Sequence, residues 1–176
     1  MKIKTLLATL LLTMNLSALT MGEVPKHVII QGEDGGLVDG NKAWDSKTLQ
    51  GNVFVMFYVD PDEKDANEHY TKALKKFKKE NNLHFQSIAI VNLAATWKPN
   101  VIIEKILASK QKEFPDTIYV KDKKSVLVKA WDIKDDASDI LIFDKNGKVI
   151  FYKAGSMSDE DMKKSFQLIK GNLANG

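Results

Sequence analysis

Four acidic side chains lie close together at one point of the chain, and they are its clearest material for chemistry. They are Asp60, Asp62, Glu63 and Asp65. Carboxylates at this spacing could bind a divalent cation through their oxygens, or two of them could act as a general acid and base. They would equally suit the positive end of a helix without forming any site. The residues alone leave these interpretations open.

The neighbouring elements make this point a natural place for a site. Val53 to Val59 is an apolar run rich in β-branched and aromatic residues, which predicts a central strand buried on both faces. Pro61 ends the strand because it has no amide to donate, and Asp65 to Glu80 has helical periodicity. Free backbone amides gather at such strand-to-helix turns. The chain nevertheless contains no cysteine, and the turn has no glycine-rich loop or serine nucleophile, so we expect no catalytic residue, metal or cofactor.

The next elements predict a βαβ unit and a further helix. Leu83 to Leu93 is predicted as a second strand, which should pair in parallel with the first through a right-handed crossover. Pro99 then begins a second helix with a broad apolar face. That face consists of Val101, Ile102, Ile103, Ile106 and Leu107. A short extended piece at 117–120 and a short helix at 126–131 follow.

The last part of the chain predicts a hairpin and a closing helix. Ile140 to Phe143 and Val149 to Tyr152 are apolar runs joined through Asn146-Gly147, a strong hairpin signal. Ser158 then begins a final helix in capping-box fashion. The expected fold class is therefore α/β, with a mixed sheet built from the βαβ unit and the C-terminal hairpin and with helices on both faces.

The composition argues against nucleic-acid recognition. The chain has 176 residues, of which 44% are hydrophobic and 28% charged, as in one soluble domain. All 26 basic residues are lysine, whereas arginine is the preferred residue for gripping phosphate and guanine. We therefore expect no nucleic-acid partner.

The N-terminus has the parts of a secretory signal. Lys2 and Lys4 precede an apolar centre from Leu6 to Leu12, which is shorter than the about 20 residues of a membrane span. We expect cleavage near residues 20 to 22, which divides the chain into a signal peptide, 1–21, and one domain, 22–176. Loss of the two leader lysines leaves 24 lysines against 23 acidic residues, a net charge of +1. No cysteine follows the apolar centre, so no membrane anchor should remain after cleavage.

Several local phrases, in this order, resemble the secreted branch of the thioredoxin-like fold and, within it, the YtfJ-type family of exported bacterial proteins. The phrases are KAWDSKTLQGNVFVMFYVDP, Ile90-Val91-Asn92, Lys129-Ala130-Trp131, Asp135-Asp136-Ala137-Ser138 and ILIFDKNGKV. The resemblance covers Val24 to Leu168 and implies a thioredoxin-like domain in the periplasm.

The chemistry of redox thioredoxins does not carry over with this resemblance. Their CxxC motif falls on the segment Asp62 to Asp65, where carboxylates replace both sulfurs and no thiolate can form. Their cis-proline position falls on Ser138, where we expect a trans bond, because a non-proline cis bond costs roughly 2.5–4 kcal/mol. The resemblance implies a cysteine-free protein without thiol redox activity.

Three functions follow from these features. The first is a non-catalytic binding or accessory protein of the periplasm, whose former active-site edge takes an extended peptide or a protein partner. Its candidate binding residues are Asp60, Asp62, Asp65, Ser138 and Asp139. The second is a carboxylate- or metal-dependent enzyme that uses the turn from Asp60 to Asp65. The third is a transcriptional regulator, a label given to family members, which the signal and the near-zero net charge disfavour.

Overall fold

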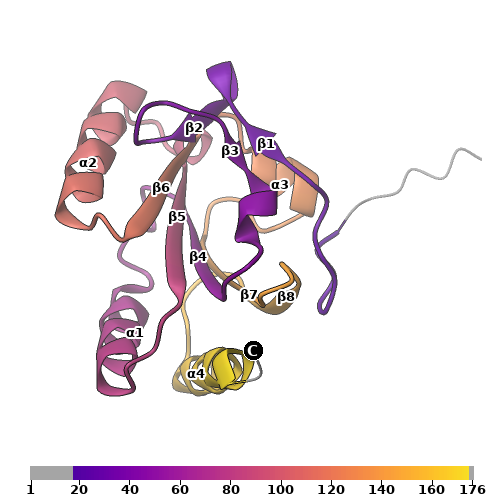
Figure 1. The fold of residues 1–176 in the computed structure, drawn as a ribbon. Helices are drawn as coiled ribbons and strands as arrows, with labels where there is room; N and C mark the ends of the chain where they lie inside the picture. The colour runs from indigo at the N-terminus through magenta and orange to yellow at the C-terminus, as the bar shows by residue number, and fades with distance from the viewer. Residues whose placement is uncertain (1–17, 175–176) are drawn as a thin grey trace, which may run out of the picture.

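The structure, a computed structural model, describes residues 18–174 (Figure 1). The predicted signal peptide, 1–21, lies outside the described residues except for its last four. No helix among the residues described is both long and apolar enough to span a membrane.

Eight strands and four α-helices make up the described part of the chain. The strands are β1 Ile29–Ile30, β2 Gly35–Leu37, β3 Trp44–Asp45, β4 Phe54–Val59, β5 Gln86–Asn92, β6 Thr117–Asp122, β7 Ser138–Phe143 and β8 Val149–Lys153. The helices are α1 Glu68–Glu80, α2 Asn100–Glu113, α3 Val126–Trp131 and α4 Asp159–Ala174. Short 3-10 turns cover Gly32–Asp34, Ser46–Leu49 and Leu93–Ala95.

Six of the strands form one mixed sheet, in the order β2-β6-β5-β4-β7-β8. β4 pairs in parallel with β5, and β5 with β6, while β7 and β8 continue the sheet antiparallel to β4. The predicted βαβ unit and C-terminal hairpin are therefore confirmed. β1 and β3 form a separate two-stranded sheet over one face.

Alternating side chains of the central strand β4 feed two cores. Phe54 and Met56 pack in the cluster that contains Trp131 of α3, whereas Val55 packs with Tyr70 of α1 and with residues of α4. α2 covers the outer part of that second face through a smaller apolar cluster around β5. Helices therefore cover both faces, as predicted, with α3 and the β1–β3 pair opposite α1 and α2 (Figure 1).

Three predicted boundaries were wrong. The first long helix begins at Glu68 rather than at Asp65, because the residues between form successive tight turns, such as Ala66 N–H to Glu63 C=O. The second strand begins at Gln86, since the Leu83 N–H instead closes the end of α1 on the Lys78 carbonyl, 3.0 Å away. The extended piece at 117–120 is a full strand that continues to Asp122 because it pairs with both β5 and β2.

Candidate functional site

The turn after β4 holds Asp60 in a closed local structure. Only 4% of Asp60 is exposed, and its carboxylate accepts a hydrogen bond from the Asp62 N–H at 2.8 Å. Its own N–H donates to the Ala137 carbonyl at 3.0 Å, which joins the turn to the residues before β7. Burial raises the pKa of the Asp60 carboxyl above its usual value. Asp60 therefore stabilises the turn from a buried position.

Asp62, which the resemblance places at the first position of the thioredoxin CxxC motif, is bound by the segment after β5. One carboxylate oxygen pairs with the Lys98 ammonium, and the other accepts a hydrogen bond from the Thr96 hydroxyl at 2.8 Å. These two hydrogen bonds hold the pKa of Asp62 below its usual value. The contact fixes the turn after β4 against the loop that leads into α2.

The other predicted residues lie in different environments. Asp65 is exposed and pairs with its neighbour Lys64, whereas Ser138 and Asp139 are buried in β7, 2% and 0% exposed. Val59 lies opposite Ser138 in the sheet. The five candidate residues are thus not brought together as one acidic surface: of the five, Asp62 and Asp65 alone lie outside the interior. That these residues bind a ligand remains a prediction.

The peptide bonds of the described residues are all trans, so the trans bond expected at Ser138 is confirmed.

The Asp139 carboxyl turns towards β8 and the loop that follows it. Its oxygens accept hydrogen bonds from the Tyr152 hydroxyl at 3.1 Å and from the Gly155 N–H at 3.3 Å. Burial raises the pKa of Asp139 to about 6, and these hydrogen bonds oppose the rise. Asp139 therefore serves the packing of the hairpin rather than the turn after β4.

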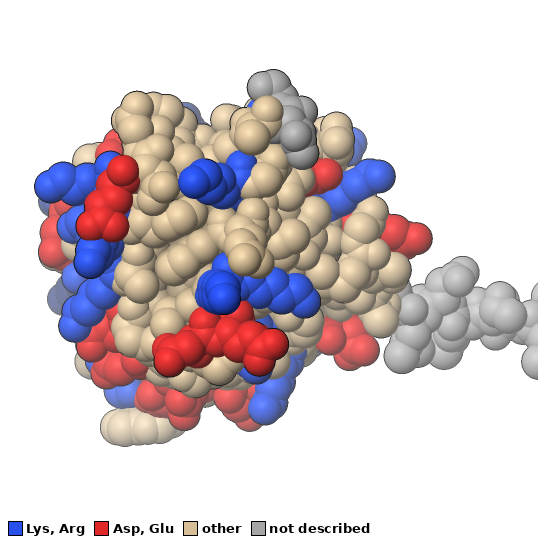
Figure 2. Space-filling view, turned by 90° about the horizontal axis from the view of Figure 1, so that it is seen from below, with Lys and Arg blue, Asp and Glu red and all other residues tan. Residues whose placement is uncertain are grey.

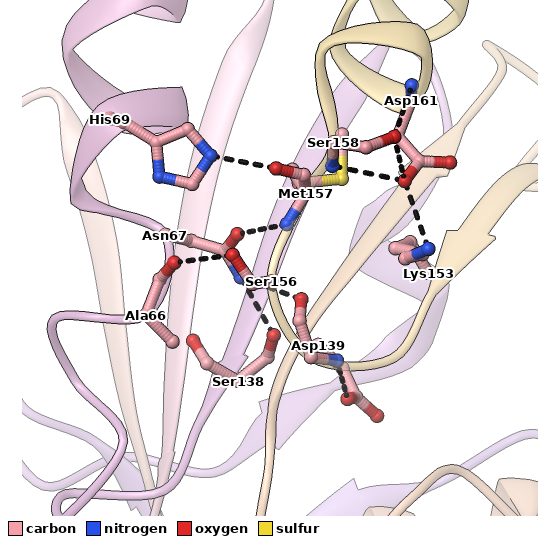
Figure 3. Close-up of polar contacts among 11 residues, drawn as sticks. Ala66, Asn67, His69, Ser138, Asp139, Lys153, Ser156, Met157, Ser158 and Asp161 are labelled. Atoms are coloured by element: carbon pink, nitrogen blue, oxygen red, sulfur yellow. Dashed lines mark hydrogen bonds and ion pairs between the residues drawn. The ribbon is translucent and has the colours of Figure 1, made fainter.

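Asn67, which the sequence patterns did not single out, joins three parts of the fold (Figure 3). Its side-chain amide donates to the carbonyls of Ser138 at 2.8 Å and Gly155 at 3.0 Å, and its oxygen accepts from the Met157 N–H at 2.9 Å. Two residues further on, in the first turn of α1, His69 Nε2 lies 2.7 Å from the Met157 carbonyl, to which it must donate. The start of α1 is thereby fastened to β7 and to the loop before α4.

A second polar network lies where β4, β5 and β6 end. Asn92 accepts a hydrogen bond from the Ser125 hydroxyl at 3.0 Å and donates to the Asp135 carboxylate at 3.0 Å. The Tyr58 hydroxyl donates to the fully buried Asp122 carboxylate at 3.0 Å. Two of the phrases quoted for the family, around Asn92 and Asp135, thus meet in space. Each of these polar groups has a partner, so the network is structural.

Exposed apolar side chains lie before and after Lys98, the partner of Asp62, along the chain. The Trp97 side chain, between Thr96 and Lys98 in the chain, is 86% exposed. On α2, Val101, Ile102 and Ile106 are 59%, 51% and 52% exposed. We call Trp97, Val101, Ile102 and Ile106 the Trp97 surface.

The broad apolar face predicted for α2 is thus only partly covered. Ile103 and Leu107 are the members that pack on the sheet, against Val91 and Leu93. The other three, Val101, Ile102 and Ile106, remain more than half exposed. Helical periodicity gives the width of an apolar face but does not show how much of it another element covers.

The described residues contain no group of three or more His, Asp or Glu side chains arranged to hold a metal ion. Of the exposed acids of the turn, Asp62 and Asp65 each pair with a lysine instead, and Glu63 is exposed as well.

The family described as "Bacterial protein of unknown function (YtfJ_HI0045)" matches residues 32–172 of the chain. The uncharacterised protein YtfJ of Escherichia coli is 26% identical over 132 residues, which cover 73% of this chain and 71% of that protein. An uncharacterised protein of Haemophilus influenzae is 28% identical over 148 residues, which cover 82% and 78%.

Among solved structures, the exposed lipoprotein thioredoxin Etrx1 of Streptococcus pneumoniae is similar, with a TM-score of 0.54. The two sequences are 12% identical, and the match covers 81% of this chain and 99% of the other. At that identity the likeness shows the fold alone, which is thioredoxin-like as predicted. Since the family match spans most of its length, this cysteine-free chain belongs to the YtfJ_HI0045 family of bacterial proteins of unknown function.

Proposed function

We propose that this protein is exported to the periplasm and acts there as a non-catalytic binding or accessory protein. The observation that carries the proposal is that the residue at the position of the thioredoxin redox motif is bound within the fold, while the apolar Trp97 surface is exposed. Asp62 is held by Lys98 and Thr96, while Trp97, between those two residues in the chain, has a side chain that is 86% exposed. We infer that the edge of the fold that carries the reactive thiols in thiol enzymes binds a partner in this protein.

Thiol chemistry is unavailable to this chain because it contains no cysteine. A disulfide exchange needs a thiolate to attack a sulfur, and no carboxylate or lysine replaces that step. In the proposed role, the partner is a protein segment or an extended peptide that is bound and released unchanged.

The Trp97 surface is suited to such a partner. Covering an aromatic side chain of about 150–250 Å² at roughly 25 cal/mol per Å² contributes about 4–6 kcal/mol before the costs of association. Tryptophan is among the residues most enriched at the centres of protein interfaces. Ile102 and Ile106 lie one helical turn apart on α2 and extend the apolar contact.

The two other functions have less support. A metal-dependent enzyme would need Asp62 to release Lys98 before it could bind a cation. A regulator that binds DNA would need a basic face, but in Figure 2 lysines and acidic residues are intermingled over the face shown.

Site-specific photocrosslinking in living cells tests the proposal. A photoreactive phenylalanine replaces Trp97 in the full-length chain, and the matched control carries it at Ile29, which is 43% exposed in the β1–β3 pair on the other face. We expect a discrete periplasmic adduct from position 97, lost when Ile106→Glu is added, and no such adduct from position 29. Equal labelling from both positions, or none from either, would contradict a binding role for this surface.

A further inference from the structure

The residues around the expected end of the signal peptide already belong to the fold. The Leu19 N–H donates to the Trp131 carbonyl at 2.9 Å, and the Leu19 side chain packs against the core cluster on the α3 face. Three residues later, the Gly22 N–H donates to the Val149 carbonyl at 2.7 Å, and the Val149 N–H donates back to Glu23 at 2.9 Å. This pairing covers the start of the edge strand β8.

The same segment forms hydrogen bonds with both polar groups of Trp131, its indole N–H and its backbone carbonyl. The indole N–H of Trp131 donates to the Lys26 carbonyl at 2.7 Å, while its backbone carbonyl accepts from Leu19. Trp131 is the last residue of α3 and is fully buried. Its carbonyl belongs to the last turn of a helix, where carbonyls lack a partner within the helix. We call residues 19–26 the N-terminal strap.

A cut at residues 20 to 22, where sequence alone placed it, would remove part of the strap. The Trp131 carbonyl would lose the Leu19 donor, and the core cluster would lose the Leu19 side chain. A cut after Gly22 would also remove the donor to Val149, at the edge of the sheet. Each of these losses leaves a backbone carbonyl without its partner in the fold.

We propose that the signal peptide is cleaved between Ala18 and Leu19, so that Leu19 is the first residue of the mature protein. The inference rests on the export proposed above. Ala18 supplies the small residue immediately before the cut, although Leu16 stands where the A-x-A pattern has a second small residue, and residues 13–18 lie between the apolar centre and the cut. Hydrolysis by a signal peptidase adds one water across the Ala18–Leu19 peptide bond, giving a carboxylate on Ala18 and an ammonium group on Leu19.

The new N-terminus would strengthen the contact that the strap makes. The Leu19 nitrogen lies 2.9 Å from the Trp131 carbonyl, so as an ammonium group it still donates to that oxygen. A positive charge is also favourable at the C-terminal end of a helix, where the backbone dipoles present their negative end. Cleavage at this bond therefore completes the fold, whereas cleavage further on would truncate it.

The test is the N-terminus of the exported protein. The full chain, 1–176, is expressed in a Gram-negative host, recovered from the periplasmic fraction, and analysed by intact mass and N-terminal sequencing. We expect Leu19 as the first residue. A mature chain that begins at Met21, Gly22 or Glu23 would overturn this inference and leave export standing, whereas an uncleaved chain in the cytoplasm would overturn both.

A thermal melt separates the role of the strap from the preference of the peptidase. Two chains, 19–176 and 23–176, are released from the same fusion partner with native N-termini. We expect the melting temperature of the shorter chain to lie several degrees lower, because it lacks Leu19 and the Gly22 donor. Equal melting temperatures would refute the strap as a reason for the cleavage position.

Discussion

Asn67→Ala removes the side chain that fastens the start of α1 to two distant segments. Asn67 is 3% exposed and makes three hydrogen bonds, to the Ser138 and Gly155 carbonyls and from the Met157 N–H. Each such bond contributes about 1 kcal/mol net, and buried partners left unsatisfied add to the loss. We expect the free energy of unfolding to fall by about 3 kcal/mol. For a chain of this size that corresponds to a decrease in melting temperature of roughly 6–12 °C.

Urea unfolding followed by circular dichroism measures this loss as a lower midpoint with an unchanged m value. The matched control is Asn172→Ala, which removes a single hydrogen bond, from the side-chain amide to the Leu168 carbonyl within α4. It should lower the free energy of unfolding by at most about 1 kcal/mol. Equal losses for Asn67→Ala and Asn172→Ala would refute the claim that Asn67 joins separate parts of the fold.

Three further changes have outcomes that the structure predicts. The pKa of Asp139 is raised to about 6 in the folded chain, so its contribution to stability is full below about pH 4 and is lost as the pH rises through 6. The free energy of unfolding of the wild type, measured by urea titration, should therefore fall by at most about 3 kcal/mol over this pH range. Asp139→Asn should not show this fall. Gly35→Ala should lower the midpoint of urea unfolding severely, or prevent folding, because the new Cβ would lie 1.9 Å from the Lys121 carbonyl oxygen at a φ of +124°. Gly171→Ala, on α4 with nothing within 4 Å of the new Cβ, should instead raise the free energy of unfolding by about 0.5–1 kcal/mol. A loss of stability there would contradict the helical assignment.

The central architecture was predictable because its signals are local. The apolar run 53–59, the Asn146-Gly147 turn and the Ser158 cap each fix one element, and short connections limit how they assemble. Ser158 indeed pairs with Asp161, its hydroxyl donating to the carboxylate at 2.7 Å. Val28-Ile29-Ile30 does predict a short strand, but nothing local predicts its pairing with Trp44–Asp45, because each strand of the β1–β3 sheet has only two residues.

The site was less predictable because its contacts span long distances in the chain. Asn67 bonds to residues 71, 88 and 90 positions away, and nothing in its local sequence marks it. Asp139 is next to Ser138 in the chain, but its side chain bonds to β8 and the loop after it, which a resemblance at the level of motifs does not reveal. The exposure of Ile102 and Ile106 likewise depends on what covers α2.

The central claim is that the Trp97 surface binds a partner and does no chemistry on it. Its most direct test is the affinity of the crosslinked partner, once purified, for the wild-type protein and for Trp97→Ser, measured by isothermal titration calorimetry. Because Trp97 is 86% exposed, the substitution should change the free energy of unfolding by less than about 0.5 kcal/mol. We expect binding to weaken by at least about thirtyfold, the loss of an interface hot spot of 2 kcal/mol, with the partner recovered chemically unchanged. Equal affinities for the two proteins, or a partner that returns covalently altered, would contradict the account.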